Sequence, residues 1–327
     1  MGRYIIKRIL YVIPSIIIIS IISFLLIDLP PGTYADTVAA EMMESASVNE
    51  SAIRAIEERY GLNQPFYVQY WKWVSGIVLR GDFGESFIWN RSVGSVMWDR
   101  LGYTLILTSG AFFFVCFMSI PIGIYSAIKQ YSFGDYLFTS LGFLGLAVPG
   151  FLLALILMYV GFKYLGQSIG GFFSPEFVHA PWSWARLLNL WSHLWIPMII
   201  VGLEGTTSLI RIVRANLLDE LYKPYVITAR AKGLSEMRLI LKYPVRLSLI
   251  PFVATVGWML PQLISGATIV SVVMSLPTTG PILLRSLMGQ DMYLAASFIL
   301  MLSVLTVIGT LISDLLLALI DPRIRFA

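Results

Sequence analysis

Long apolar runs that are free of charge organise the chain. Five such runs lie between charged residues, and a sixth is interrupted only by Glu204. A helix needs about 20 residues to cross the roughly 30 Å of hydrocarbon in a bilayer. Helices are expected because lipid leaves no solvent for backbone polar groups, and the runs lack the alternation typical of barrel strands. We therefore predict an all-α membrane protein with six spanning helices, at 9–27, 101–128, 136–162, 194–210, 249–272 and 292–313.

Two of these runs need a closer description. The fifth lies in an uncharged stretch between Arg246 and Arg285 that exceeds the length of one helix, so we place one span in its first half and predict a turn-rich loop for the rest. The first follows Arg3, Lys7 and Arg8, as in a signal peptide. At about 19 residues, with no small-x-small site after it, it is expected to remain as the first helix.

Lysine and arginine are distributed unevenly between alternate loops. The loop 211–246 carries eight of them, and both termini carry more. Because short cytoplasmic loops are enriched in these residues, we expect both termini and this loop in the cytoplasm. The chain then divides into an N-terminal segment with the first helix (1–28), an external loop with short helices (29–100), and a core with the other five helices and the internal loop 211–246 (101–327).

Composition narrows the class of protein. The chain has 57% hydrophobic and 13% charged residues, and a mean hydropathy of +0.78; soluble domains carry roughly 25% charged residues. A net charge of +4 without a basic stripe speaks against nucleic-acid binding. Cys116, His179 and His193 do not form a metal-ligand set.

The external loop carries two helix signals. Ser47 and Glu50 have the spacing of a capping box, and Gly61 would end the helix that follows. The aromatic-rich stretch 66–79 suits a helix in the headgroup layer. These helices could form a docking platform for an external partner or a cap that shields the bundle.

The internal loop is the most informative segment. It predicts a short helix, then Gly233 in a left-handed conformation, then a second short helix with Ser235 as its N-cap. The small Ala229 and Ala231 allow close approach of another surface, and Arg230 and Lys232 supply charge. A protein-docking device and an ordinary basic loop both fit this pattern.

The sequence Thr-Ala-Arg-Ala-Lys-Gly-Leu at 228–234 resembles the EAA-type loop of binding-protein-dependent ABC importer permeases, in the dipeptide/oligopeptide/nickel group and its form with a long external loop. The general Glu-Ala-Ala is replaced by Ile227-Thr228-Ala229, as in that group, and Leu276-Pro277-Thr278-Thr279-Gly280 stands where many members have Pro-Gly-Leu-Gly. Other segments match the group in order: Leu29-Pro30-Pro31-Gly32, Tyr60-Gly61-Leu62-Asn63-Gln64-Pro65, Gly81-Asp82-Phe83-Gly84-Glu85-Ser86, Ile120-Pro121-Ile122-Gly123, Val148-Pro149-Gly150-Phe151 and Leu319-Ile320-Asp321-Pro322-Arg323.

The resemblance implies a non-catalytic subunit of an ATP-hydrolysing transporter. The expected partners are a second permease chain in a heterodimer, two cytoplasmic ATPase subunits, an external solute-binding protein and the lipid bilayer of a bacterial or archaeal inner membrane. The chain has no phosphate-binding G-x-x-x-x-G-K-[ST] loop, so ATP and magnesium are expected on the ATPase and no cofactor in this chain. The residues implied to couple to the ATPase are Tyr225, Thr228, Ala229, Arg230, Ala231, Lys232, Gly233, Leu234 and Glu236.

Two acids lie within predicted spans. Glu204 stands near the middle of the fourth, where an acid usually faces the bundle interior or a water-filled cavity. It is a candidate for the translocation pathway, or a structural acid satisfied by Thr206, Thr207 or a partner subunit. Asp314, seven residues before Asp321, is a candidate structural acid that pairs with a base of the internal loop.

Other functions are weighed against an importer of peptides. An ion-coupled secondary transporter would show several buried acids and repeated broken helices. A membrane-embedded enzyme would need a nucleophile and base, or metal ligands, inside the spans. Within the importer class, oligosaccharides, opines and nickel chelates are alternative cargoes, since the external binding protein sets most of the specificity.

Overall fold

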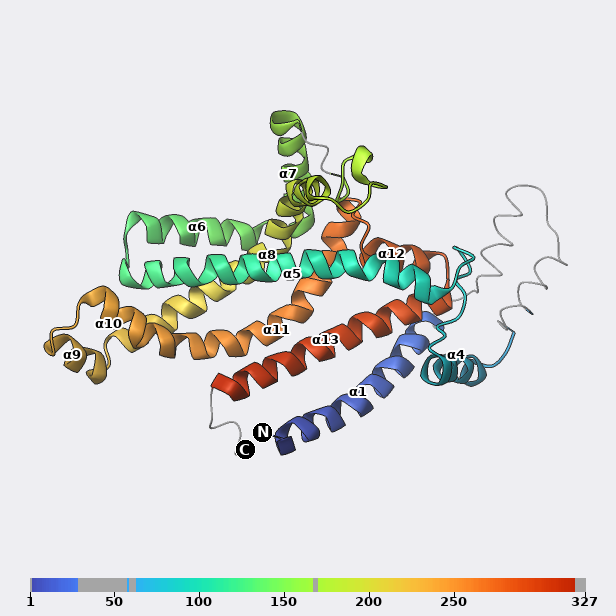
Figure 1. Ribbon diagram of the computed structural model, residues 1–327, viewed down its shortest axis with the longest axis horizontal. Helices are drawn as coiled ribbons and strands as arrows, with labels where there is room; N and C mark the ends of the chain where they lie inside the picture. Colours follow the sequence, from blue (N-terminus) through green and yellow to red (C-terminus); the bar gives the residue numbers. More distant parts are fainter. Residues whose placement is uncertain (1, 29–57, 59–62, 167–169, 321–327) are drawn as a thin grey trace. The chain divides into compact units, whose positions relative to one another are not determined.

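The computed structural model describes residues 2–28, 58, 63–166 and 170–320. Within these residues all regular structure is helical, apart from one isolated bridge between Glu85 and Ser92. The elements are α1 (Gly2–Asp28), α4 (Phe66–Arg80), α5 (Val93–Ile128), α6 (Phe133–Ala147), α7 (Gly150–Leu165), the 3-10 turn η1 (Pro175–Phe177), α8 (Trp184–Leu221), α9 (Pro224–Ala231), α10 (Glu236–Lys242), α11 (Pro244–Val273), α12 (Thr279–Met288) and α13 (Met292–Ile320) (Figure 1).

Four helices are long and apolar enough to cross a membrane. They are α1, α5, α8 and α13, and two bent pairs raise the number of candidate spans to as many as six in the described chain. The bent pairs are α6 with α7, and the segment Glu236–Thr255 with Met259–Val273. The prediction of a helical protein with several apolar spans is therefore confirmed.

The third predicted span is not one straight helix. Helix α6 ends at Ala147 and α7 begins at Gly150, and their axes differ by 109°. Val148 is extended, with φ −92° and ψ 121°, because the ring of a following proline disfavours helical geometry in the residue before it. Pro149 then stands at the N-cap of α7, where its missing N–H costs no helical hydrogen bond.

The turn-rich loop predicted after the fifth span is partly wrong, since it contains the helix α12. Thr278 is extended at its N-cap, and Pro281 lies in its first turn, where proline is tolerated. Ile282 and Ser286 are buried on one side of α12, while Arg285 stacks on the Trp89 ring at 5.1 Å. Burial of one face of α12 in the tertiary structure thus stabilises a short helix, where the prolines had favoured a turn.

The described residues form two compact units. Unit 1 contains Thr104–Pro277 with the ends of α1 and α13, and unit 2 contains the described parts of Ile6–Tyr103 with Thr278–Leu305. Helices α1, α5 and α13 contribute residues to both.

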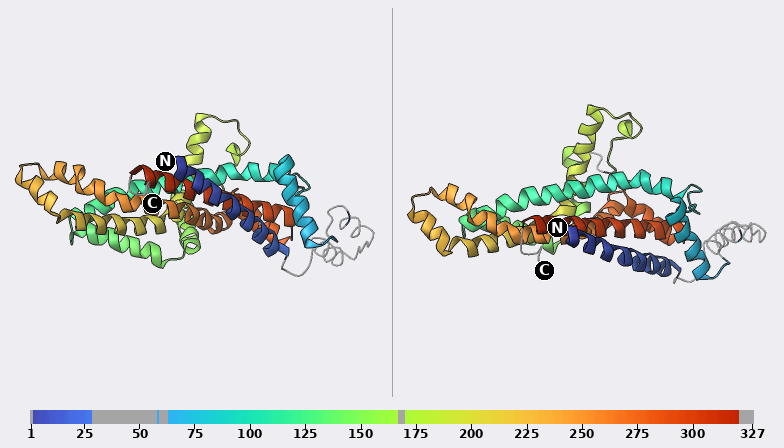
Figure 2. Two further views of the ribbon diagram at one scale, coloured as in Figure 1. Left: turned by 90° about the horizontal axis from the view of Figure 1, so that it is seen from below. Right: turned by 60° about the horizontal axis from the view of Figure 1, so that its bottom comes forward.

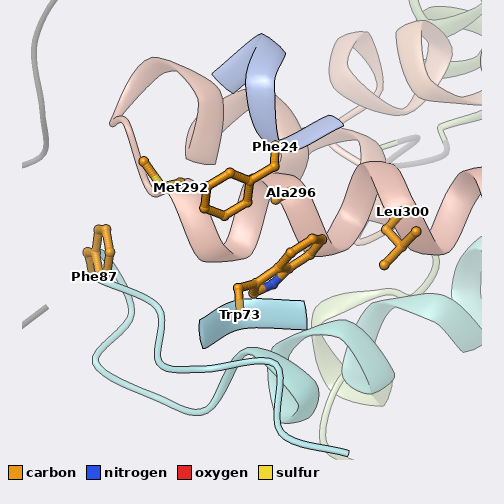
Figure 3. Packing of buried hydrophobic residues seen from close by; sticks show 6 residues of the cluster. All are labelled: Phe24, Trp73, Phe87, Met292, Ala296 and Leu300. Atoms are coloured by element: carbon orange, nitrogen blue, oxygen red, sulfur yellow. The ribbon is translucent and has the colours of Figure 1, made fainter. Parts of the chain in front are cut away.

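Unit 2 is built around aromatic packing. The predicted helix at 66–79 is confirmed as α4, but Trp73 is only 3% exposed and packs in a core cluster instead of lying on the surface. Figure 3 shows the rings of Phe24 and Trp73 against the part of α13 that carries Met292, Ala296 and Leu300. The helix expected from the capping box at 47–50 lies outside the described residues.

A buried carboxylate joins the 86–88 turn of unit 2 to α13. Asp291 is fully buried, and its Oδ2 accepts hydrogen bonds from Ser86 Oγ at 2.5 Å and the Ile88 N–H at 3.2 Å. Its Oδ1 accepts from the Leu294 N–H at 3.2 Å, which caps the first turn of α13. Burial raises the pKa of the Asp291 carboxyl, although these donors act in the opposite direction.

Replacing Asp291 by alanine should destabilise the protein by about 2 kcal/mol, because buried donors lose their acceptor and α13 loses its cap. Asp291→Asn should cost less, since it keeps an oxygen acceptor and burial already disfavours the charged form. Thermal unfolding in detergent measures the stability of both variants. Equal losses from the two substitutions would contradict a hydrogen-bonding role.

Unit 1 is organised by α8 and α11, which form its most extensive helix pair. Helix α6 packs on α8 through small residues. A Cβ on Gly142 would lie 2.8 Å from Thr207 Cγ2, and one on Gly145 would lie 2.5 Å from Leu203 Cδ2. Helices α9 and α10 lie beyond the ends of α8 and α11, as the views in Figures 1 and 2 agree.

Candidate functional site

The segment formed by α9, Gly233 and α10 (residues 224–242) is called the elbow below. Pro224 occupies the first turn of α9, which ends when the N–H groups of Lys232 and Gly233 bond to the carbonyls of Thr228 and Arg230. Gly233 has φ +81°, the left-handed conformation expected at this position. Ser235 is the N-cap residue of α10, as predicted, although its side chain makes no capping hydrogen bond.

One apolar cluster holds the elbow on unit 1. Val226 of α9 is fully buried and packs with Leu217 of α8, Leu239 of α10 and Val245 of α11. Ala127, at the end of α5, belongs to the same cluster. The ends of three long helices therefore meet the elbow in a shared core, so a displacement of the elbow has to move that core.

The residues implied for coupling divide into two groups. Tyr225, Ala229 and Leu234 are partly buried and pack against the cluster around Val226. The other six are exposed: Thr228, Arg230, Ala231, Lys232, Gly233 and Glu236. The exposed face also contains Ile227 and Met237, which are 57% and 65% exposed. Neither apolar residue was among those implied for coupling, and their exposure is known only from the structure.

An ion pair closes the elbow. The guanidinium of Arg230 donates to both carboxylate oxygens of Glu236, with Nη2 and Oε2 3.2 Å apart and Nε bonded to Oε1. The sequence suggested Arg230 as a charge for a partner protein, and the structure shows that it already has a partner within the elbow. Both side chains are about half exposed, so solvent screens much of the attraction between the two charges.

A second polar contact ties α9 to the end of α8. The Tyr225 hydroxyl donates to Glu220 Oε2 at 2.6 Å, and Lys223 Nζ lies 2.5 Å from Glu220 Oε1. Burial and the neighbouring carboxylate raise the pKa of the Tyr225 hydroxyl, so the tyrosine stays a neutral donor. This contact fixes the direction in which α9 leaves α8.

An ion pair between α6 and α8 was not predicted from the sequence. Asp135 of α6 is 4% exposed and accepts two hydrogen bonds from Arg214 of α8, at 3.0 and 3.2 Å. The Tyr131 N–H also donates to Asp135, at 3.0 Å. These residues are 79 positions apart in the chain, so their spacing carries no signal of contact.

Glu204 is exposed on α8, and its Oε1 accepts a hydrogen bond from Gln262 Nε2 of α11 at 3.0 Å. The threonines that were considered as its partners bond elsewhere, Thr206 to Gly202 O and Thr207 to the carbonyls of Gly142 and Leu203. Asp314 lies partly buried on α13, while Asp321 is outside the described residues. Pairing of Asp314 with a basic residue of the internal loop stays a prediction.

Two family models together match almost the whole chain. Residues 119–326 match the model described as binding-protein-dependent transport system inner membrane component, and residues 1–108 match the N-terminal model of the same components. The chain belongs to this family. The resemblance to ABC importer permeases is therefore confirmed, and the chain is a multi-pass membrane permease that is itself non-catalytic.

Curated relatives match the permease along its whole length. The oligopeptide transport system permease protein AppB of Bacillus subtilis is 34% identical over 327 residues, all of both chains. The glutathione transport system permease protein GsiC of Salmonella typhimurium is 30% identical over 326 residues, again all of both chains. A putative peptide permease protein of Brucella ovis is 29% identical over 327 residues, 99% of each chain.

Proposed function

We propose that this permease forms half of the translocation pathway of an ATP-driven importer for peptides. The observation that carries the proposal is the exposed elbow, anchored through Val226 in a core shared by α5, α8 and α11. Its sequence at 228–234 resembles the EAA-type loop of ABC importer permeases, and it lies within the residues that match the family model. The relatives named for oligopeptides and glutathione support peptide cargo.

In this proposal the six candidate spans cross the membrane with both termini and the elbow in the cytoplasm, following the lysine and arginine distribution. The exposed Thr228, Ala231 and Lys232 face a groove on the ATPase. Ile227 and Met237 add apolar contact area to the same face.

The proposed assembly contains a second, different permease chain, two ATPase subunits and an external binding protein. ATP and magnesium bind to the ATPase subunits, and closure of the ATPase dimer shifts the bundle between inward- and outward-facing states. The permease contributes the passage and the mechanical connection. Three elbow residues contribute indirectly: Tyr225, Ala229 and Leu234 pack against the core and hold the exposed residues of the elbow in place.

The proposal predicts that the chain co-purifies with an ATPase and that uptake requires both. The complete transporter, reconstituted in proteoliposomes with its binding protein, should import alanine peptides only when ATP is present on the ATPase side. Leaving out the ATPase should abolish uptake. Peptide uptake by the permease alone, driven by an ion gradient, would contradict the proposal and favour a secondary transporter.

A further inference from the structure

Polar residues line one exposed side of the α8 and α11 pair. On α8, Glu204, Ser208 and Arg211 follow one another at helical spacing, the first and last of them exposed. On α11, Gln262 and Ser265 are exposed, and a Cβ on Gly266 would meet nothing within 4 Å. The hydrogen bond between Glu204 and Gln262 joins the two rows. Such a polar stripe within candidate spans does not suit contact with lipid tails.

The negative charge of Glu204 is not neutralised within the part of the chain that the structure describes. Its only described polar contact is the amide of Gln262, and no lysine or arginine of these residues forms an ion pair with it. Arg211 lies seven residues further along α8, about 10 Å along the helix axis. Because a carboxylate in a membrane span is costly, it requires water or a cation that is not among the described residues.

The polar atoms of Glu204 and Gln262 that are not used in their mutual hydrogen bond indicate which kind of cation would bind. The amide nitrogen of Gln262 donates to Glu204 Oε1, so the pair presents Glu204 Oε2 and Gln262 Oε1 as free acceptors. The second N–H of the Gln262 amide is the one donor left, so this negatively charged pair consists mainly of acceptors and favours a group that is rich in donors. An ammonium group supplies three N–H donors and one positive charge.

We propose that Glu204 and Gln262 form a binding site for the ammonium group of the cargo, such as the free amino terminus of a peptide. The inference rests on the proposed import function and specifies which chemical group the passage recognises. Charge-assisted hydrogen bonds are stronger than neutral ones, so the site gives preference to cargo with a free amine. The location between α8 and α11 places recognition on the two helices that continue into the elbow.

The test uses the complete transporter in proteoliposomes and a mixture of alanine peptides of two to five residues, with uptake measured by mass spectrometry. Glu204→Gln keeps an amide that can bond to Gln262 but removes the charge. Uptake should fall roughly tenfold or more, the factor expected for loss of a hydrogen bond to a charged group. The double variant Glu204→Gln with Gln262→Glu returns the charge to the site from the other helix and should restore most of the uptake.

A matched control removes one exposed acid elsewhere. Glu176 lies in η1, and Glu176→Gln should leave uptake unchanged. Co-purification of the second permease and ATPase should be the same in every variant. Wild-type uptake by Glu204→Gln would overturn the ammonium site and leave the import function standing. Loss of co-purification in Glu204→Gln would overturn it too, because Glu204 would then pair with a neighbouring subunit. No ATP-driven uptake by the wild type would overturn the proposed function itself.

Discussion

Replacing Gly233 by valine is expected to abolish ATP-driven import while the permease still folds and enters the membrane. Gly233 has φ +81°, a conformation that costs a residue with a side chain roughly 1–2 kcal/mol, and more when the side chain is β-branched. Apart from Gly233 and its two neighbours, no atom of the described residues lies within 4 Å of a Cβ built there, so the expected loss comes from the backbone and not from a clash inside the permease. A valine would turn the chain toward extended geometry and separate Arg230 from Glu236.

Gly233→Asn is the matched control for this prediction. Asparagine tolerates the left-handed conformation better than other residues with a side chain, and it adds a side chain of similar size. It should keep a substantial part of the import activity. The measurements are peptide uptake and stimulation of ATP hydrolysis in the reconstituted transporter. If both variants import like the wild type, the geometry at Gly233 does not matter for coupling.

The second large effect is expected at the ion pair between α6 and α8. Asp135→Ala leaves the guanidinium of Arg214 without its carboxylate and removes an acceptor from the Tyr131 N–H. Breaking a buried pair by removing one partner costs about 3–5 kcal/mol. Since the Arg214 side chain is 27% exposed, we expect the lower end of this range, about 3 kcal/mol. The midpoint of thermal unfolding in detergent should fall accordingly.

The exposed pair of Arg91 and Asp99 provides a control for charge removal. Both side chains are more than half exposed, and the pair is closed by one contact of 3.2 Å. Asp99→Ala should cost less than about 1 kcal/mol. A shift for Asp135→Ala no larger than the one for Asp99→Ala would mean that solvent already screens the pair between α6 and α8.

Local signals in the sequence located the long apolar helices and the elbow. Gaps between charged residues report membrane crossing directly, because charge is costly in hydrocarbon. Gly233 and Ser235 act within a few residues of their own position, so their roles as helix end and N-cap position followed from the sequence. The family motif at 228–234 is the basis for the proposed contact between the elbow and an ATPase.

Features that depend on contacts across the chain could not be predicted in this way. The pair of Asp135 and Arg214 joins residues 79 apart, and the burial of Trp73 depends on α1 and α13. Helix α12 is stabilised by the burial of Ile282 and Ser286, and the prolines of this segment carry no information about that burial. Arg230 is a suitable charge for a partner by sequence, yet its geometry pairs it with Glu236.

The bend at Val148 and Pro149 has a consequence for the lipid that surrounds the permease. Helices α6 and α7 have 15 and 16 residues, so each measures about 22–24 Å, less than the hydrocarbon thickness of roughly 30 Å. With 109° between them they do not add up to one straight crossing. Non-helical backbone within the hydrocarbon is tolerated only against protein or water. In the proposed arrangement of six spans, a neighbouring subunit or a hydrated crevice therefore takes the place of annular lipid beside this break.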